Sequence, residues 1–337
     1  MYNLDVVYHS SDKFSWIMGV SMTSILINNP DTFFNFYIIE NEISESNKEK
    51  LRLLEKLYHC NVNFVSMPDF KKDFKLNLYQ IKENWLFDSF SRMFLGTLLP
   101  NTVEKVLYLD SDTIVNKKID YLIQLDLGTK LIAGVKESLS VKYLDVFQID
   151  HDTPYFQGGV FLINLKEWRK RNIEEQIVSY INEKKGYIFF MEQTVMSAIC
   201  GKDSLVLPLN YNWTTINSCF SFNEIIKIRK PNMWYNKDEN EQAKKNVVIF
   251  HFTNCFYINN RPWVKYCNHP QIKLFLKYKE MSLFREKPLY EGKRNYFRTL
   301  VLHMIPKKIL ACLLGWIYNN FRVKKIIKEQ KLKRNRD

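Results

Sequence analysis

Short apolar runs alternate with longer segments of helical periodicity near the start of the chain. The runs at 4–8, 34–39 and 61–65 have the length of buried strands, and the segments 14–27 and 46–58 have the length and apolar spacing of helices. A strand–helix–strand–helix–strand order requires parallel strands joined by helical crossovers. The pattern therefore predicts an α/β fold built on a mainly parallel sheet.

The same alternation continues, without an internal repeat, to about residue 285. We expect residues 1–285 to form one domain and residues 286–337 to form a basic, amphipathic, helical appendage. Further strands are expected at 104–109, 130–135, 160–163 and 247–250, and further helices near 86–98, 165–181 and 191–199.

The composition is that of a folded globular protein, since 46% of the 337 residues are hydrophobic and 25% are charged. These values exclude a largely disordered chain and a collagen-like chain. The ten glycines form neither G-x-G-x-x-G nor G-x-x-x-x-G-K, which argues against a dinucleotide-binding fold and against a P-loop. A phosphorylated ligand would therefore need a different binding device.

The net charge of +13 is concentrated at the C-terminus, because residues 292–337 hold 13 Lys and Arg but only two acidic residues. Leu310, Leu314 and Trp316 lie among these cations, and the mixture is typical of an interfacial anchor on anionic lipid. A helix packed on the body with a solvated end would have the same pattern. We expect no signal peptide and no spanning helix. Charge confined to one end also argues against a nucleic-acid partner.

Asp110, Ser111 and Asp112 directly follow the apolar run 104–109. Side chains two residues apart in an extended chain point to the same side, and open α/β sheets bind ligands at the carboxyl ends of their strands. Two carboxylates beside a diphosphate suit a hard divalent cation. A solvated turn would also fit a D-x-D sequence, but the apolar residues on both sides of it, in VLYLDSDTIV, favour a ligand site.

The run VLYLDSDTIV resembles the D-x-D segment of the family 8 glycosyltransferases, which are retaining sugar-nucleotide transferases of GT-A fold. Four other segments resemble parts of that family in the same order: VVYHSSDKFSW, FDSFSRMFLGTLLP, YFQGGVFLINLKEWR and HFTNCFYINNRPW. The likeness covers about residues 3–270. It implies a GT-A fold and an enzyme similar to the bacterial galactosyl- and glucosyltransferases that build surface glycans.

The resemblance implies a metal site formed by Asp110, Asp112 and His251. The sequence itself supports the third ligand, because His251 follows the expected strand 247–250 and would be presented by a strand end. One imidazole with two carboxylates suits Mn²⁺ somewhat better than Mg²⁺. A metal site built between residues 92 and 263 is expected to need nothing from the C-terminal tail.

Other family positions imply contacts with the sugar nucleotide. Ser11 stands where the family has an acid, Asn254 where it has Gly, and Arg261 where it has Lys. The spacing from Asn254 to Arg-Pro-Trp is also longer, so this loop is expected to close differently over the phosphates. The implied nucleotide and phosphate contacts are Ser11, Asp12, Arg92, Ser111, Asn254 and Arg261.

Four more positions match residues that the family places around the sugar. Gln193 matches a Gln beside the anomeric carbon, and Glu192 stands where an Asp is common. Glu137 and Gln157 would also touch the sugar. Because a neutral amide is a weak nucleophile, attack from the face of the departing phosphate is favoured over a double displacement, with Gln193 and Glu192 as the catalytic pair.

The resulting hypothesis is a metal-dependent retaining hexosyltransferase. It would move galactose or glucose from a UDP-hexose to a glycan or lipid-linked glycan acceptor in bacterial surface polysaccharide or lipopolysaccharide synthesis. We expect it in the cytoplasm, attached peripherally to the inner face of the cell membrane through the tail. The alternatives are a non-catalytic, membrane-associated sugar-nucleotide-binding protein with a decayed transferase fold, and a metal-dependent nucleotidyltransferase.

Overall fold

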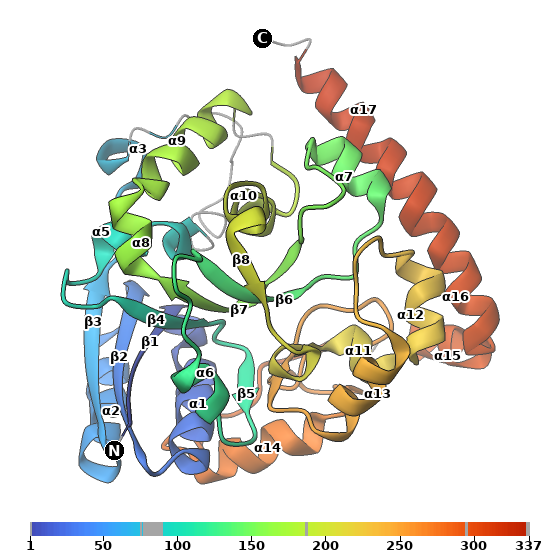
Figure 1. The fold of residues 1–337 in the computed structure, drawn as a ribbon. Coiled ribbons are helices and arrows are strands. Elements are labelled where there is room, and N and C mark those ends of the chain that lie inside the picture. The colour runs from blue at the N-terminus through green and yellow to red at the C-terminus, as the bar shows by residue number, and fades with distance from the viewer. Residues whose placement is uncertain (1, 75, 77–89, 186–187, 294–295, 335–337) are drawn as a thin grey trace.

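The computed structural model describes residues 2–74, 76, 90–185, 188–293 and 296–334 (Figure 1). Its centre is a seven-stranded sheet in the order β3-β2-β1-β4-β7-β6-β8, with helices packed around it. Four of these strands are β1 (Tyr2–Ser11), β2 (Thr32–Asn41), β3 (Cys60–Ser66) and β4 (Lys105–Leu109), and they pair in parallel. The predicted α/β fold with a mainly parallel sheet is confirmed.

The second half of the sheet changes direction. Strand β7 (Phe156–Asn164) lies between β4 and β6 (Ile132–Lys136) and is antiparallel to both, whereas β8 (Ser204–Val206) is parallel to β6. All nine residues of β7 are buried, as expected of a central strand covered on both faces. The sheet is therefore mixed, and the first half of β7 lies beside the end of β4, where the Asp-x-Asp turn begins.

A smaller sheet carries the last predicted strand. Strand β10 (Ile249–His251) pairs antiparallel with β5 (Thr113–Val115) and parallel with β9 (Trp213–Thr214). In this register His251 lies opposite Thr113, one residue beyond the turn. The small sheet thus brings two segments together that are more than a hundred residues apart in the sequence.

Helix α1 (Asp12–Asn28) is buried on all sides from residue 15 to residue 26, because it lies between the central sheet, β5 and α14 (Ile272–Met281). Its hydroxyl groups form hydrogen bonds with backbone carbonyls of the helix itself and with groups on the neighbouring strands. Ser21 Oγ lies 3.0 Å from Thr113 Oγ1, and Ser24 Oγ accepts a 2.9 Å hydrogen bond from the Val115 amide. These buried bonds tie α1 to the strand that follows the Asp-x-Asp turn.

Two expected helices differ from the observed ones. The expected helix 165–181 is divided into α8 (Leu165–Lys170) and α9 (Ile173–Glu183), because Asn172 adopts a left-handed conformation with φ 49°, which Asn tolerates well. Of the expected helix 86–98, residues 86–89 lie outside the described residues, and the rest forms the 3₁₀ turn η1 (Ser91–Met93) and the single turn α5 (Leu95–Leu98).

The remaining helices of the body lie around the two sheets. They are α2 (Glu45–Leu57), α3 (Phe70–Asp73), α6 (Asp120–Gln124), α7 (Val141–Phe147), α10 (Met191–Cys200), η2 (Gly201–Asp203), η3 (Leu209–Tyr211), α11 (Thr215–Cys219), α12 (Phe222–Arg229) and α13 (Lys237–Lys245).

The tail forms α15 (Tyr296–Met304), α16 (Lys307–Trp316), the π-helical turn η4 (Ile317–Arg322) and α17 (Val323–Arg334), drawn in orange-red to red in Figure 1. Helix α16 packs on α12, and α17 packs on α7. Gly315 allows the close approach, because a Cβ there would collide with the carbonyl oxygen of Lys227. Asn319 Nδ2 donates to the Ile228 carbonyl at 3.0 Å.

The opposite face of the tail is open to solvent and partly apolar. Its exposed side chains include Ile309, Leu313, Trp316 and Phe321, of which Trp316 is 63% exposed. None of the helices within the described ranges is both long enough and apolar enough to cross a bilayer. The tail therefore has one face packed on the body and one mixed apolar and basic face turned outward. The division of the chain at residue 285 stays a prediction.

Candidate active site

The Asp-x-Asp turn joins the two sheets. The Asp110 amide donates to the Gly159 carbonyl at 2.9 Å, and the Thr113 amide and hydroxyl both bond to the Asp110 carbonyl. Ser111 Oγ donates to the His9 carbonyl at 2.6 Å. The turn is thus bonded to β1, to β7 and to itself, which holds Asp110 and Asp112 in place.

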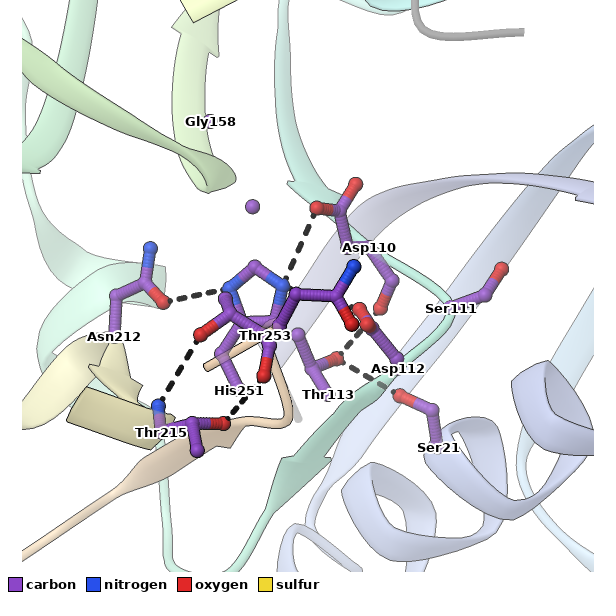
Figure 2. Close-up of polar contacts among 12 residues, drawn as sticks. Ser21, Asp110, Ser111, Asp112, Thr113, Gly158, Asn212, Thr215, His251 and Thr253 are labelled. Carbon is purple, nitrogen blue, oxygen red and sulfur yellow. Dashed lines mark hydrogen bonds and ion pairs between the residues drawn. The ribbon is translucent and has the colours of Figure 1, made fainter. Parts of the chain in front are cut away.

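The imidazole of His251 lies between these two carboxylates (Figure 2). Its Nε2 is 3.4 Å from Asp110 Oδ2 and 3.1 Å from Asp112 Oδ1. The three potential ligand atoms lie within 4.8 Å of one another, which is close enough to hold one metal ion. The structure therefore brings together the three residues that the sequence analysis assigns to a metal.

Asn212 sets the orientation of that imidazole. His251 Nδ1 donates to Asn212 Oδ1 at 3.1 Å, and Asn212 Nδ2 donates to Gln157 Oε1 at 2.6 Å. The Gly159 amide also donates to Gln157 Oε1, at 2.8 Å. With Nδ1 held by Asn212, Nε2 is the ring nitrogen directed at Asp110 and Asp112, and it is the atom that would bind a metal ion. In this structure Gln157 contacts the candidate metal site through Asn212.

Two glycines make room for the cluster. A Cβ on Gly159 would collide with the His251 ring, and a Cβ on Gly158 would lie 2.9 Å from the Gln193 side chain and 3.2 Å from Arg92. The Gly-Gly pair of β7 therefore lets the strand backbone pass directly against the site.

Each carboxylate of the turn has an arginine partner. Arg92 Nη2 is 2.9 Å from Asp110 Oδ1, which also accepts from the Tyr108 hydroxyl, and the Arg92 guanidinium lies over the Tyr108 ring. Arg261 Nη1 donates to Asp112 Oδ2 at 2.7 Å, while its Nε donates to Asn254 Oδ1 at 2.9 Å. Two negative charges this close need such compensation.

The same charges shift the titration of the cluster. Burial raises the pKa of Asp112, but His251 and Arg261 outweigh that effect and hold the pKa below its ordinary value. Burial lowers the pKa of His251, but the Asp112 and Asp110 carboxylates outweigh it and raise the pKa. Without a metal ion, both directions favour the charged forms, a carboxylate on Asp112 and an imidazolium on His251.

Glu192 and Gln193 enter the site from the first turn of α10. The two residues before them, Phe190 and Met191, have φ values of 57° and 43°, which are strained for side chains of this kind. Gln193 Nε2 donates to the Phe156 carbonyl at 3.2 Å, and Glu192 Oε1 is 3.7 Å from Arg92 Nη1. The strained backbone thus presents a carboxylate and an amide beside the Asp-x-Asp turn.

Two cavities meet at the cluster. The larger one has a volume of about 1170 Å³ and the smaller one about 310 Å³. Both are lined by Asp110, Asp112 and Arg261. The expected residues that line only the larger are Glu137, Gln157, Glu192, Gln193, His251 and Asn254, and those that line only the smaller are Ser11, Arg92 and Ser111.

Asp12 is placed differently from the other expected site residues. Its Oδ1 accepts hydrogen bonds from the Ser44 amide, the Ser44 hydroxyl and the Asn47 side chain, at 2.7–2.9 Å. These bonds lower the pKa of Asp12 and connect the start of α1 to the start of α2. Asp12 lines neither cavity as the structure describes them.

The tail contributes to the larger cavity, which the sequence analysis does not anticipate. Leu314, Ile317, Tyr318 and Arg322 line it together with Arg229 of α12. The three potential metal ligands all come from the body, whereas the tail forms part of the wall of the larger cavity. That the metal site needs nothing from the tail stays a prediction. The sequence analysis also misses Tyr108 and Asn212, whose roles depend on neighbours distant in the sequence.

The sequence model described as glycosyl transferase family 8 matches residues 5–267, which is most of the chain. The chain belongs to this family. The enzyme is therefore a glycosyltransferase, as the resemblance of its five segments implies.

Its relatives include enzymes with named reactions. A lipopolysaccharide 1,2-glucosyltransferase of Escherichia coli K12 is 26% identical over 322 residues, which cover 91% of this chain and 88% of that protein. A lipopolysaccharide 1,3-galactosyltransferase of Salmonella typhimurium is 22% identical over 285 residues, covering 82% of this chain and 78% of that one.

The fold of this family 8 enzyme is also similar to that of a solved galactosyltransferase. The structure of LgtC in complex with donor and acceptor sugar analogues superposes with a TM-score of 0.67 at 21% identity, over 83% of this chain and 96% of that chain. The expected GT-A fold is thus confirmed.

Replacing Asn212 tests how the site is oriented. We expect Asn212→Ala to weaken Mn²⁺ binding about 10-fold or more, because His251 loses the acceptor that fixes its tautomer. Titration calorimetry of Mn²⁺ in the presence of UDP measures this. The control is Asn210→Ala, whose half-buried side chain lies outside the cluster and donates to the Asn246 carbonyl at 3.1 Å. An Mn²⁺ affinity of Asn212→Ala equal to that of the control would contradict this account of the site.

Proposed function

We propose that this glycosyltransferase transfers galactose or glucose from a UDP-hexose to a glycan acceptor, with retention of configuration and with a divalent metal ion. The observation that carries the proposal is the position of Asp110, Asp112 and His251 where two cavities of unequal size meet. A nucleotide in the smaller cavity and a sugar in the larger one would place the bond to be broken at this junction.

The residues present fit a divalent metal. Two carboxylates and one imidazole, with the imidazole proton held on the far nitrogen by Asn212, form a suitable oxygen and nitrogen donor set. We propose Mn²⁺ as the ion, because the imidazole ligand suits it better than Mg²⁺. A bound metal ion would supply positive charge to the diphosphate as it departs.

Arg261 is proposed to bind the same diphosphate. In this structure Arg261 Nη1 donates to Asp112 and Nε donates to Asn254, so the side chain already lies beside the Asp-x-Asp turn. Its planar guanidinium could donate two hydrogen bonds to the phosphates of the sugar nucleotide. Arg92 would keep Asp110 in position from the other side, since it is anchored by the Gly158 carbonyl and by Tyr108.

Gln193 and Glu192 are proposed to hold the hexose. Because Gln193 Nε2 is engaged by the Phe156 carbonyl, its Oε1 is the atom available to the sugar. An amide oxygen is a poor nucleophile, which favours attack by the acceptor hydroxyl from the face that the phosphate leaves. The bond from C1 to the phosphate oxygen breaks, the bond from C1 to the acceptor oxygen forms, and the departing phosphate takes the acceptor's proton.

The acceptor is proposed to be a glycan of a lipopolysaccharide or another bacterial surface polysaccharide. The relatives named as lipopolysaccharide glucosyl- and galactosyltransferases support this class of acceptor. A protein with this role would act in the cytoplasm at the inner face of the cell membrane.

Donor hydrolysis tests the proposed reaction. With UDP-glucose, UDP-galactose and other sugar nucleotides, we expect slow release of UDP from one UDP-hexose, dependent on Mn²⁺ and abolished by chelator. Asp112→Asn should lower the rate by about 100-fold or more, because a charged ligand and the partner of Arg261 are lost together. Asp126→Asn, on the loop after α6, provides a matched control. Hydrolysis that persists in chelator, or in Asp112→Asn, would refute the metal-dependent mechanism.

We propose further that the outward face of the tail attaches the enzyme to an anionic membrane. Leu313, Trp316 and Phe321 are more than half exposed there, beside a segment with 13 Lys and Arg. Each basic residue near an anionic surface contributes about 1 kcal/mol, and buried apolar area adds a contribution that salt does not screen.

Vesicle sedimentation tests this attachment. We expect Trp316→Glu to lower binding to phosphatidylglycerol vesicles about 10-fold or more, because it places a negative charge on the proposed contact face. High salt should weaken wild-type binding only in part. The control is Leu57→Glu, since Leu57 is 60% exposed but lies on α2, far from the tail (Figure 1). Equal binding by Trp316→Glu and the control would place the membrane contact elsewhere.

A further inference from the structure

The larger cavity reaches beyond the metal cluster to a wall formed by α12 and the tail. Arg229 is the last residue of α12, and Tyr318 and Arg322 belong to the π-helical turn η4. Such wide turns occur frequently at functional sites. The wall thus combines an irregular stretch of helix with two cations at the cavity surface.

Both guanidinium groups gather on one aromatic ring. The Cζ of Arg229 lies 4.3 Å from the centroid of Tyr318, and that of Arg322 lies 5.5 Å from it and 4.9 Å from the centroid of Phe190. The Tyr143 hydroxyl donates to the Tyr318 carbonyl at 2.7 Å, which fixes this turn on the body. The two arginines are therefore held in place by packing against aromatic rings.

The charge of this pair is only partly balanced by the protein, because the Glu137 carboxylate attracts Arg229 without forming an ion pair with it. Within the described ranges, no carboxylate forms an ion pair with Arg229 or Arg322, and the Nε of Arg229 is buried without a hydrogen-bond partner. Two cations that share a ring repel each other, and partial burial makes their charge costly. An anion bound between them would relieve both costs.

The position of the pair indicates which substrate carries that anion. Asp110, Asp112 and Arg261 separate the smaller cavity, proposed for the nucleotide, from the larger one. The two arginines line only the larger cavity, together with Glu137, Glu192 and Gln193. They are therefore on the side that the hexose and the acceptor would occupy.

We infer that Arg229 and Arg322 bind an anionic group of the acceptor, a phosphate or a carboxylate carried by the glycan. The inference rests on the proposed function and adds the class of acceptor to it. Guanidinium groups suit such oxyanions because they donate paired hydrogen bonds in a plane. The tail thus takes part in choosing the acceptor as well as in the proposed membrane contact.

Small sugar probes test the subsite without knowledge of the natural acceptor. With Mn²⁺ and saturating UDP on the donor side, the affinities of glucose 6-phosphate, glucuronate and glucose are measured by ligand-observed NMR titration. We expect glucose 6-phosphate or glucuronate to bind about 10-fold more tightly than glucose. Whichever of the two binds better identifies the anion as phosphate or carboxylate. Inorganic phosphate alone is included to measure binding that needs no sugar.

Variants assign the effect to the two arginines. Arg322→Gln and Arg229→Gln should each remove most of the gain from the anionic group, while Arg322→Lys should keep part of it. Lys324→Gln, an exposed position on the same helical stretch, is the matched control and should keep the full gain. Thermal unfolding of each variant verifies that the tail still folds, and Arg322→Lys keeps the test decisive if one Gln variant unfolds.

Three results would overturn the inference. The first is equal affinity of the wild type for glucose and for both anionic sugars. The second is a full gain in affinity from the anionic group in both Gln variants. The third is a loss of anionic-vesicle binding in Arg322→Gln with sugar binding unchanged, which would mean that Arg322 binds lipid. Failure of the proposed function is distinguishable from all three, because it would appear as absence of Mn²⁺-dependent UDP binding in the wild type.

Discussion

Two carboxylates, Asp110 and Asp112, share one imidazole nitrogen of His251 at 3.4 and 3.1 Å, and two negative charges gathered around one nitrogen must be compensated. Much of the surrounding structure serves that requirement. Arg92 and Arg261 each neutralise one carboxylate from opposite sides of the turn. The antiparallel pairing of β5 with β10 places the His251 imidazole beside the two carboxylates, and the Gly-Gly pair of β7 makes space for it. A divalent ion could replace part of this compensation, which makes the cluster suited to bind one.

Much of the fold follows from local pattern. The parallel strands β1 to β4 and the buried helix α1 are predictable, because alternating apolar segments of the right length leave few topologies. Asp110 and Asp112 are predictable as a ligand site because they directly follow a buried strand. The antiparallel direction of β7 is not predictable, since an apolar run is the same in either direction. The Asn212–His251 hydrogen bond is also not predictable from the sequence, because it depends on how β9 and β10 align in space.

The composition of the tail predicts its helices but not how they pack. Its mixture of Leu, Trp, Lys and Arg predicts an amphipathic helix, but it cannot say which side packs on the body. In the structure Gly315 and Asn319 face α12, Leu313 and Trp316 face solvent, and Tyr318 and Arg322 face the cavity. One stretch of helix therefore has three faces, and each is available to a different partner: the protein body, a membrane, or a substrate.

The central claim is that Asp110, Asp112 and His251 together bind one catalytic metal ion. Pulsed electron paramagnetic resonance of the Mn²⁺-loaded enzyme with UDP tests it most directly, because an imidazole nitrogen bound to Mn²⁺ modulates the electron spin echo. The account predicts a signal from one directly bound imidazole nitrogen in the wild type and its loss in His251→Gln. Absence of that signal in the wild type, or its persistence in His251→Gln, would contradict the account.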